Sequence, residues 1–376
     1  VFSGGTDTCA ILNDSTVKCW GHGAWGQLGQ GSLEDLLSPP RSVVNLGLGR
    51  TARAIAIGLE DTCTLLVDFT VKCWGKGDHG RLGQGSTTDL SSPPSSATNL
   101  GPGRKAKAIA TGEEHTCALL DDATIKCWGG GAEGQLGQGN TTDLSSPPSS
   151  AINLGLGRTA KAIATGGYHT CALLDHSTVK CWGYGASGQL GLHSHDSLSS
   201  PANEAINLGL GRMAKAIATG TIFTCAILDD ATVKCWGYGY YGQLGQGSTP
   251  DDVSSPPVSA INLGLGRTAK AIATGYNHTC ALLDDSTVKC WGKGDFGQLG
   301  QGSTAHLSSP PVSAIHLGSN RTAKAIAAGA EHTCALLDDS TVKCWGFGFF
   351  SQLGQGSTAN LGDQPTEMAS LAAIII

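Results

Sequence analysis

The chain has 376 residues, including 55 Gly and 14 Cys, and only 14% are charged, against about 25% in an average soluble domain. The formal net charge is −6, which argues against a nucleic-acid binder because neutralising phosphates needs a clustered basic surface. No apolar run approaches the roughly 18 to 20 residues of a membrane helix, so we expect no membrane insertion by this segment. The start on Val1, without a basic and apolar leader, is typical of a mature fragment.

The basic residues are spread evenly along the chain. Nineteen of the 24 Lys and Arg fall in three repeated slots: Lys18, Lys72, Lys126, Lys180, Lys234, Lys289 and Lys343; Arg50, Arg104, Arg158, Arg212, Arg267 and Arg321; and Arg53, Lys107, Lys161, Lys215, Lys270 and Lys324. A repeated slot distributes charge around a body and forms no basic patch. This pattern also argues against nucleic acid as a partner.

The cysteines fall in seven pairs, each separated by ten residues: Cys9 and Cys19, Cys63 and Cys73, Cys117 and Cys127, Cys171 and Cys181, Cys225 and Cys235, Cys280 and Cys290, and Cys334 and Cys344. Successive pairs lie 54, 54, 54, 54, 55 and 54 residues apart, so the repeat fills the chain. Periods of this size are typical of solenoids, propellers or arrays. We therefore predict a single domain over residues 1–376, built from seven repeats of about 54 residues.

The fourth repeat shows the predicted elements in chain order. Alternation of small and larger residues over 160–164 predicts a first strand with its small residues facing inward. A Gly-Gly turn follows, then a second strand at 170–174, a polar tip at 175–177 and a third strand at 178–182. After a long Gly/Ser/Pro-rich loop we expect a fourth short strand in each A-I-N-L segment, such as residues 151–154. Four short strands without helical periodicity are typical of a propeller blade.

The two chain ends fall at nearly the same phase of the repeat. Val1 aligns with Ile163 and Ile376 aligns with Thr322, both in or beside a first strand. An open solenoid would need atypical polar capping repeats. We therefore predict an all-β, seven-bladed β-propeller of four-stranded antiparallel blades. Its ring would be closed by joining the N- and C-terminal segments, with residues 371–376 completing the blade of the first cysteine pair.

Three motifs recur in order through the chain with few substitutions: H-T-C-A-L-L, T-V-K-C-W-G and G-Q-L-G. With them the whole sequence resembles the regulator of chromosome condensation repeat family, and the resemblance implies a seven-bladed propeller. The nuclear founder of that family activates a small GTPase on chromatin, but this chain is acidic and lacks a basic tail, so that activity and its residues do not transfer. Secreted members, the bacterial β-lactamase inhibitor proteins, bind protein partners through loops on one face.

Each cysteine pair lies across a predicted hairpin, so its two residues face each other at a distance that permits a disulfide. Seven disulfides would place the protein in an oxidising compartment, extracellular or at the cell surface. The alternative is zinc, with a His two residues before the first Cys as in His169. Asp7, Asp61 and Phe223 replace that His in three repeats that keep both Cys, which argues against a metal.

Two further patterns resemble motifs of cofactor-binding or catalytic sites. Gly183, Gly185 and Gly188 match a dinucleotide-binding G-x-G-x-x-G, but Q-L-G follows them where that site needs a helix, so we expect tight loops and no cofactor. Paired acids such as Asp121 and Asp122 fall at the hairpin tips, where Asp favours turns.

Four sequons permit N-glycosylation in a eukaryotic host: Asn13, Asn140, Asn277 and Asn320.

The aromatic residues vary between repeats where the rest of the motif does not. They concentrate in the loops after the first and third predicted strands, which leave an antiparallel blade at the same end. The candidate binding face comprises Trp25, Tyr184, Tyr238, Tyr240, Tyr241, Tyr276, Phe296, Phe347, Phe349 and Phe350. Tyr and Trp are typical of binding surfaces. The alternative is local loop packing or drift.

These observations favour a non-enzymatic extracellular structural or interaction module, part of a larger surface protein or assembly. Its partner would be a protein or glycan, other parts of the assembly or copies of itself. One alternative is a secreted inhibitor of an extracellular enzyme. Another is a carbohydrate-active enzyme, which would need converging carboxylates among Asp78, Glu133 and Asp295.

Overall fold

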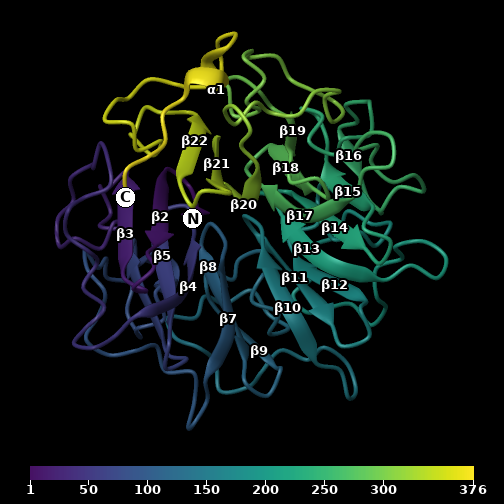
Figure 1. Cartoon of the computed structure of the whole chain (residues 1–376). Helices are drawn as coiled ribbons and strands as arrows, with labels where there is room; N and C mark the ends of the chain where they lie inside the picture. The colour runs from purple at the N-terminus through teal and green to yellow at the C-terminus, as the bar shows by residue number, and fades with distance from the viewer.

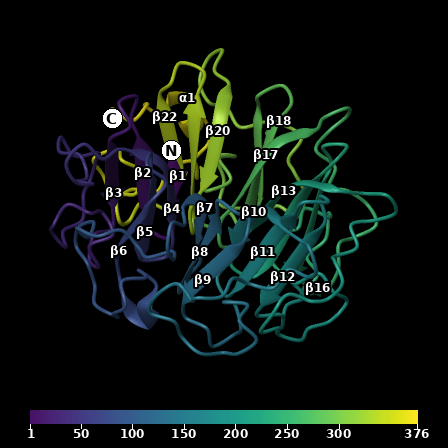
Figure 2. The ribbon, with the colours of Figure 1, turned by 90° about the horizontal axis from the view of Figure 1, so that it is seen from below.

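In the computed structural model, which describes residues 1–376, seven antiparallel sheets, six of three strands and one of four, surround a central axis (Figure 1). The innermost strands are β1 (Phe2–Ser3), β4 (Ala52–Ile57), β7 (Ala106–Thr111), β10 (Ala160–Thr165), β13 (Ala214–Thr219), β17 (Ala269–Thr274) and β20 (Ala323–Ala328). Figure 2 shows most of these strands side by side, and β1 contacts both β4 and β20.

The second and third strands of each sheet form a hairpin. The second strands are β2 (Asp7–Ile11), β5 (Asp61–Leu66), β8 (His115–Leu120), β11 (His169–Leu174), β14 (Phe223–Leu228), β18 (His278–Leu283) and β21 (His332–Leu337). The third strands are β3 (Val17–Gly21), β6 (Val71–Gly75), β9 (Ile125–Gly129), β12 (Val179–Gly183), β15 (Val233–Tyr238), β19 (Val288–Gly292) and β22 (Val342–Gly346). The only helices are a 3₁₀ turn, η1 (Asp78–Gly80), and α1 (Glu367–Ser370).

The two cysteines of each pair lie directly opposite each other in the hairpin register, and all seven pairs form disulfides. Their Cα atoms are 4.0 to 4.1 Å apart, and no Cys is free. The bonds join Cys9 to Cys19, Cys63 to Cys73, Cys117 to Cys127, Cys171 to Cys181, Cys225 to Cys235, Cys280 to Cys290 and Cys334 to Cys344. These are the seven pairs that the sequence predicts. No sulfur is left to ligate zinc, which removes the metal alternative for these residues.

The predicted fourth strand is wrong in its position and extent. Residues 151–154 form no strand, and Ile152 donates a single backbone hydrogen bond to Ile125 at the start of β9 (2.9 Å). At the other end of β9, Leu144 forms an isolated bridge with Gly129. Between these points the Pro-Pro pair has no N–H to donate, and the carbonyl of Ser145 accepts from Gly85 of the preceding blade (2.8 Å).

The same outer segment covers the third strand of every sheet. Only one blade extends it into a strand, β16 (Asp252–Val253), which pairs with β15. We call this irregular connection the outer segment, residues 144–154 in the third blade. It occupies the place of a fourth strand and is fixed to the sheet at its two ends.

Adjacent blades are joined by the repeated motifs themselves. Thr170 Oγ1 and the indole Nε1 of Trp182 both donate to the backbone oxygen of Gln135 in the preceding blade, at 2.9 and 3.0 Å. All seven W-G tryptophans are fully buried and make this bond. The T-C, C-W and G-Q-L-G motifs therefore recur because together they build one joint between blades.

The last blade contacts the first through the same joint. Thr8 Oγ1 and Trp20 Nε1 donate to the backbone oxygen of Gln352, at 2.9 and 3.1 Å. The expected role of residues 371–376 needs correction, because Ile374 bridges Val342 of β22 and so completes the last blade. The outer segment belongs to the hairpin that precedes it, and the first blade has its own first strand, β1. The only α-helix, α1, has four residues, so no helix here could span a bilayer.

Candidate functional site

The two ends of the propeller differ in the loops they carry. One end carries the turn between the first and second strands of each sheet and the start of the loop after the third strand, and we call it the pocket face. The other end carries the hairpin tips, and we call it the hairpin face. The variable aromatic slots belong to the pocket face, as the antiparallel order of the strands predicts.

A pocket of about 160 Å³ lies at the centre of the pocket face. It is lined by the turns between the first and second strands of all seven blades. Backbone hydrogen bonds of 2.8 to 3.2 Å join these turns at five of the seven blade junctions: Gly5 to Gly58, Glu113 to Gly167, Gly167 to Thr221, Tyr276 to Ala330 and Ala330 to Gly4. The mouth of the pocket is therefore a ring of interlocked turns.

Close packing explains the glycine that opens each turn. A Cβ at Gly112 would lie 2.5 Å from the backbone oxygen of Gly166 in the next blade and 2.5 Å from the ring of His115. Any larger residue would push adjacent turns apart and open the pocket.

A buried histidine lies beneath the turn in four blades and bonds to the next blade. His115 Nε2 is 2.8 Å from Thr170 Oγ1, whose own proton goes to the Gln135 carbonyl, so the imidazole is the donor. His169, His278 and His332 repeat this bond at 2.9 to 3.0 Å. Burial lowers the pKa of all four imidazoles to about 3, so they are neutral structural groups.

Three blades have another residue in the histidine position. Phe223 is fully buried there, and Asp7 and Asp61 are buried carboxyl groups. Burial raises the pKa of Asp61 to about 7 and that of Asp7 well above its usual range, with the nearby Asp61 adding to the effect on Asp7. These two acids therefore resist ionisation more strongly than any exposed carboxyl group.

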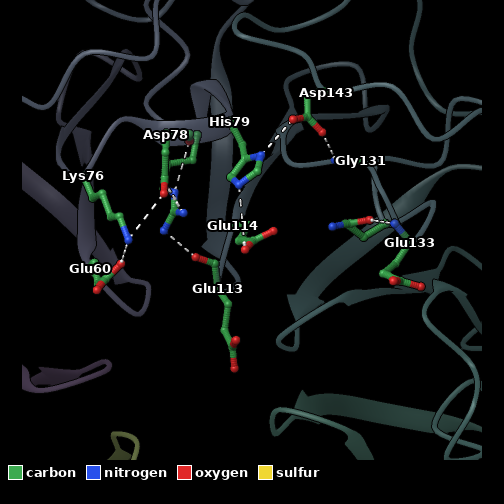
Figure 3. Close-up of polar contacts among 11 residues, drawn as sticks. Glu60, Lys76, Asp78, His79, Glu113, Glu114, Gly131, Glu133 and Asp143 are labelled. Carbon is green, nitrogen blue, oxygen red and sulfur yellow. Dashed lines mark hydrogen bonds and ion pairs between the residues drawn. The ribbon is translucent and has the colours of Figure 1, made fainter.

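One side of the pocket face carries a network of charged residues from the second and third blades (Figure 3). Lys76 forms ion pairs with Glu60 and Asp78, at 2.5 and 3.3 Å. Burial opposes the charge of Lys76, but these two acids outweigh it and raise its pKa. Arg81, where the other repeats have Gln, forms an ion pair with Asp78 and donates to the backbone oxygen of Glu113 at 2.6 Å.

The network extends to the third blade through His79. Its Nδ1 lies 2.8 Å from Asp143 and its Nε2 lies 3.9 Å from Glu114 (Figure 3). The bond to Asp143 raises the pKa of His79. Asp143 also accepts from the backbone of Gly131 at 2.9 Å. The network thus fixes the loops of two blades and leaves more acidic than basic groups on this side.

The other side of the pocket face carries aromatic rings in mutual contact. Tyr240 and Tyr241 pack edge to face with centroids 5.1 Å apart, and Phe349 and Phe350 repeat the arrangement at 5.2 Å. We call the whole set the aromatic arc. Its first group of touching rings is Tyr238, Tyr240 and Tyr241, with His306 against Tyr241, and its second is Phe296, Phe347, Phe349 and Phe350, with His22 against Phe350. Tyr240 and Phe349 project furthest, with 56% and 64% of their surfaces exposed.

Lys293 connects the two halves of the aromatic arc. Its Nζ lies 5.6 Å from the ring centre of Tyr241 and 5.4 Å from that of Phe296, distances at which a cation is attracted to an aromatic face. Glu331 holds the same ammonium at 2.7 Å. In the first blade Trp25 lies under Lys76, 4.5 Å from its Nζ. Lys76 therefore links Trp25 to the charged network.

Comparison with known proteins identifies this arrangement of seven sheets. A family model described as the RCC1-like domain matches residues 16–375. The chain belongs to the RCC1-like domain family. The ultraviolet-B receptor UVR8 of Arabidopsis thaliana is 30% identical over 363 residues, which cover 96% of this chain and 79% of that receptor. The human E3 ubiquitin-protein ligase HERC2 is 31% identical over 369 residues, but these cover only 7% of HERC2.

Solved structures share the fold of this RCC1-like propeller. Yeast RCC1 (Prp20), in its complex with Kap60, matches 100% of the chain and 85% of its own, with a TM-score of 0.79 at 21% identity. The ectodomain of the Arabidopsis thaliana receptor kinase ACR4 matches 94% of the chain and 95% of its own, with a TM-score of 0.54 at 19% identity. This chain therefore shares its fold both with yeast RCC1 and with the ectodomain of a plant receptor kinase.

The structure places the predicted face residues of this RCC1-like propeller in four environments. Seven form the aromatic arc, and Trp25 lies against Lys76 of the charged network. Tyr276 lines the central pocket. Tyr184, in the fourth blade, has no aromatic partner in the structure. The sequons Asn13, Asn140 and Asn320 are exposed, whereas Asn277 is half-buried and its side chain lies 3.4 Å from Gln243 Nε2.

The hairpin face of the RCC1-like propeller has its own charged and apolar groups. The paired acids at the tips bind arginines: Arg104 lies 2.7 Å from Asp122, and the equivalent pairs recur around the ring. Four leucines of the L-G-L-G-R turns are fully exposed: Leu48, Leu156, Leu210 and Leu265. Sequence reasoning missed these leucines and the central pocket, although a leucine between two glycines in a repeated turn was a usable signal.

Proposed function

We propose that this RCC1-like propeller is a non-enzymatic extracellular interaction module whose aromatic arc binds a protein partner. The observation that carries the proposal is that two groups of touching rings, bridged by Lys293, lie on loops of three neighbouring blades. Tyr240 and Phe349 are large rings left exposed at its two ends. Large aromatic side chains anchor protein interfaces because they bury much area with little loss of rotamer entropy.

The disulfides support the extracellular setting. Disulfides persist in oxidising compartments, and this chain has seven with no free Cys. The receptor-kinase ectodomains among its structural neighbours are consistent with that setting. The family alone does not fix the compartment, because one relative, RUG3 of Arabidopsis thaliana, is described as mitochondrial.

The enzyme alternative has less support. A glycosidase needs two carboxyl groups that face one substrate. Asp78 is held by Lys76 and Arg81, and Asp295 lies beside Lys293 (3.6 Å) and His306 (3.6 Å). Those contacts suit acids that anchor loops.

Replacing Tyr240, Tyr241, Phe349 and Phe350 together by Ser should reduce capture of the native partner at least tenfold, because the rings at both ends of the arc are lost. The measurement is a pull-down from native, unreduced surface material, followed by quantitative mass spectrometry. The double variant Y240S/F349S changes only the two most exposed rings and should keep the wild-type Tm.

A variant of the hairpin face provides the matched control. Leu156, Leu210 and Leu265 are fully exposed, and replacing them by Ala removes a similar apolar surface from the opposite end of the propeller. The proposal fails if the aromatic variants capture the partner as well as wild type does, or if the leucine variant alone loses it. If glycosidase treatment of the partner abolishes capture, the ligand of the arc is a glycan on the partner and not its protein surface.

A further inference from the structure

The central pocket has an unbalanced charge. Of the 21 residues that line it, Glu113 is the only charged one, and no Lys, Arg or His is among them. The Glu113 carboxylate has no basic partner, since Arg81 binds only its backbone oxygen. By contrast, the neighbouring acids Glu60 and Glu331 are each paired with a lysine. Glu113 thus forms no ion pair. Burial raises the pKa of its carboxyl group, and the Tyr168 hydroxyl and the charge of Arg81 act against that shift.

Unsatisfied hydroxyl groups accompany this carboxylate. The Oγ atoms of Ser3, Thr111 and Thr221 are buried, belong to pocket-lining residues and have no hydrogen-bond partner. These three atoms expose no surface to the pocket and lie on three different blades, so the Glu113 carboxyl group is the charged acceptor that an occupant with N–H donors would meet.

An aromatic ring completes the lining. Tyr276 is pocket-lining and largely buried, and nearby Glu113 adds to the burial that raises the pKa of its phenol. The Tyr168 hydroxyl is similarly close to Glu113, and burial with the Glu113 and Glu114 charges raises its pKa to about 12. Two neutral phenols beside one carboxylate form an environment that favours organic cations.

The size and rigidity of the pocket restrict the occupant further. A volume of about 160 Å³ admits one small polar group with a short alkyl stem, and the interlocked turns leave no room for a larger ring system. Because the turns are already bonded to one another, the site is formed before any ligand binds.

We propose that the central pocket binds one alkylammonium or guanidinium group, with Glu113 as its counter-ion. The group is either a free amine or a Lys or Arg side chain of a bound partner. The site is separate from the aromatic arc, so it stands whether or not the arc binds a protein.

The test is a titration of unglycosylated, disulfide-intact protein with n-butylammonium or n-butylguanidinium chloride, followed by amide and Thr-methyl NMR. We expect shifts confined to the pocket turns and a Kd of about 1–10 mM, in keeping with the few atoms of these probes. The E113Q variant should weaken binding at least tenfold.

The control variant is E133Q, which removes the same charge from a loop of the same blade away from the pocket, where Glu133 bonds Gln135 through its backbone. It should bind like wild type, and so should Y240S/F349S. Sodium chloride and n-butanol should produce no saturable shifts. A peptide amide with one Lys or Arg that binds more tightly than the free cation would assign the source to a partner's side chain; equal affinity would assign it to free amines.

Absence of saturable shifts in the pocket turns would overturn the proposal, as would equal affinities of wild type and E113Q. To separate the second result from misfolding, the Tm of each variant is measured, and E113Q is expected to match wild type because its carboxylate bonds no cation. Failure of the arc to bind a partner would leave these shifts unchanged.

Discussion

Reduction of the seven disulfides should unfold the protein at 37 °C. Each disulfide closes a loop of ten residues, which corresponds to about 2–3 kcal/mol of stability in the chain-entropy model. Seven together amount to about 14–21 kcal/mol, more than the roughly 5–15 kcal/mol that separates most native domains from their unfolded state. The measurement is refolding from denaturant with and without a phosphine reductant, followed by far-UV circular dichroism.

Denaturant is needed in that experiment because every cysteine is buried and shielded from the reductant. A matched variant, C171A/C181A, removes one disulfide and should lose about 2–3 kcal/mol while keeping the fold. Refolding of the fully reduced chain to the oxidised Tm would contradict the prediction. The stability of the fold would then give no reason to expect an oxidising compartment.

Acidification from pH 6 to pH 4 should destabilise the propeller by about 3 kcal/mol per pH unit and unfold it. The four buried histidines have folded pKa values near 3, against about 6.5 in the unfolded chain, so the unfolded state takes up their protons first. The stability that these neutral histidines provide is fully present above pH 6.5 and is lost as the pH falls toward 3. Four such groups contribute about 5 kcal/mol per pH unit.

Two buried acids act in the opposite direction. The folded pKa of Asp61 is raised to about 7 and that of Asp7 is also raised, so both groups favour the folded state as the pH falls. They offset about half of the histidine effect, since each contributes at most about 1.4 kcal/mol per pH unit. The variant D61N should therefore steepen the acid transition.

The chain itself offers the matched variant for the histidines. Phe223 fills the same position in the fifth blade, so H169F replaces one titrating group by a residue the joint already accommodates. It should reduce the pH dependence by about 1.4 kcal/mol per pH unit, measured by urea unfolding at each pH. A stability that is flat between pH 6 and pH 4 would show that these imidazoles are not buried as neutral groups.

Repetition made most of the fold predictable. The ten-residue spacing of Cys171 and Cys181 fixes a hairpin register, and seven copies leave few architectures. The outer segment was predicted in the wrong place because its pattern of A-I-N-L looks strand-like locally. Its backbone groups are instead used by the neighbouring blade, as in the bond from Gly85 to Ser145, and no single repeat shows that competition.

The binding features were predictable only in part. Variation against a uniform background identified Tyr240 and Phe349 as loop aromatics, and the antiparallel order placed them at one end. Which rings touch depends on the loop conformations, so the sequence could not show that Tyr276 lies in the pocket, apart from the arc. Nor could it show the isolation of Glu113, because pairing of Glu60 and Glu331 with lysines is a property of tertiary structure.

The outer segment has a consequence for behaviour at high concentration. A sheet that ends in a bare strand offers a row of free N–H and C=O groups on which another chain can polymerise. Here the row is occupied at its two ends by the bonds of Leu144 and Ile152, and Pro147 and Pro148 between them cannot donate. A protein with seven nearly identical edges can therefore accumulate without seeding β-rich aggregates.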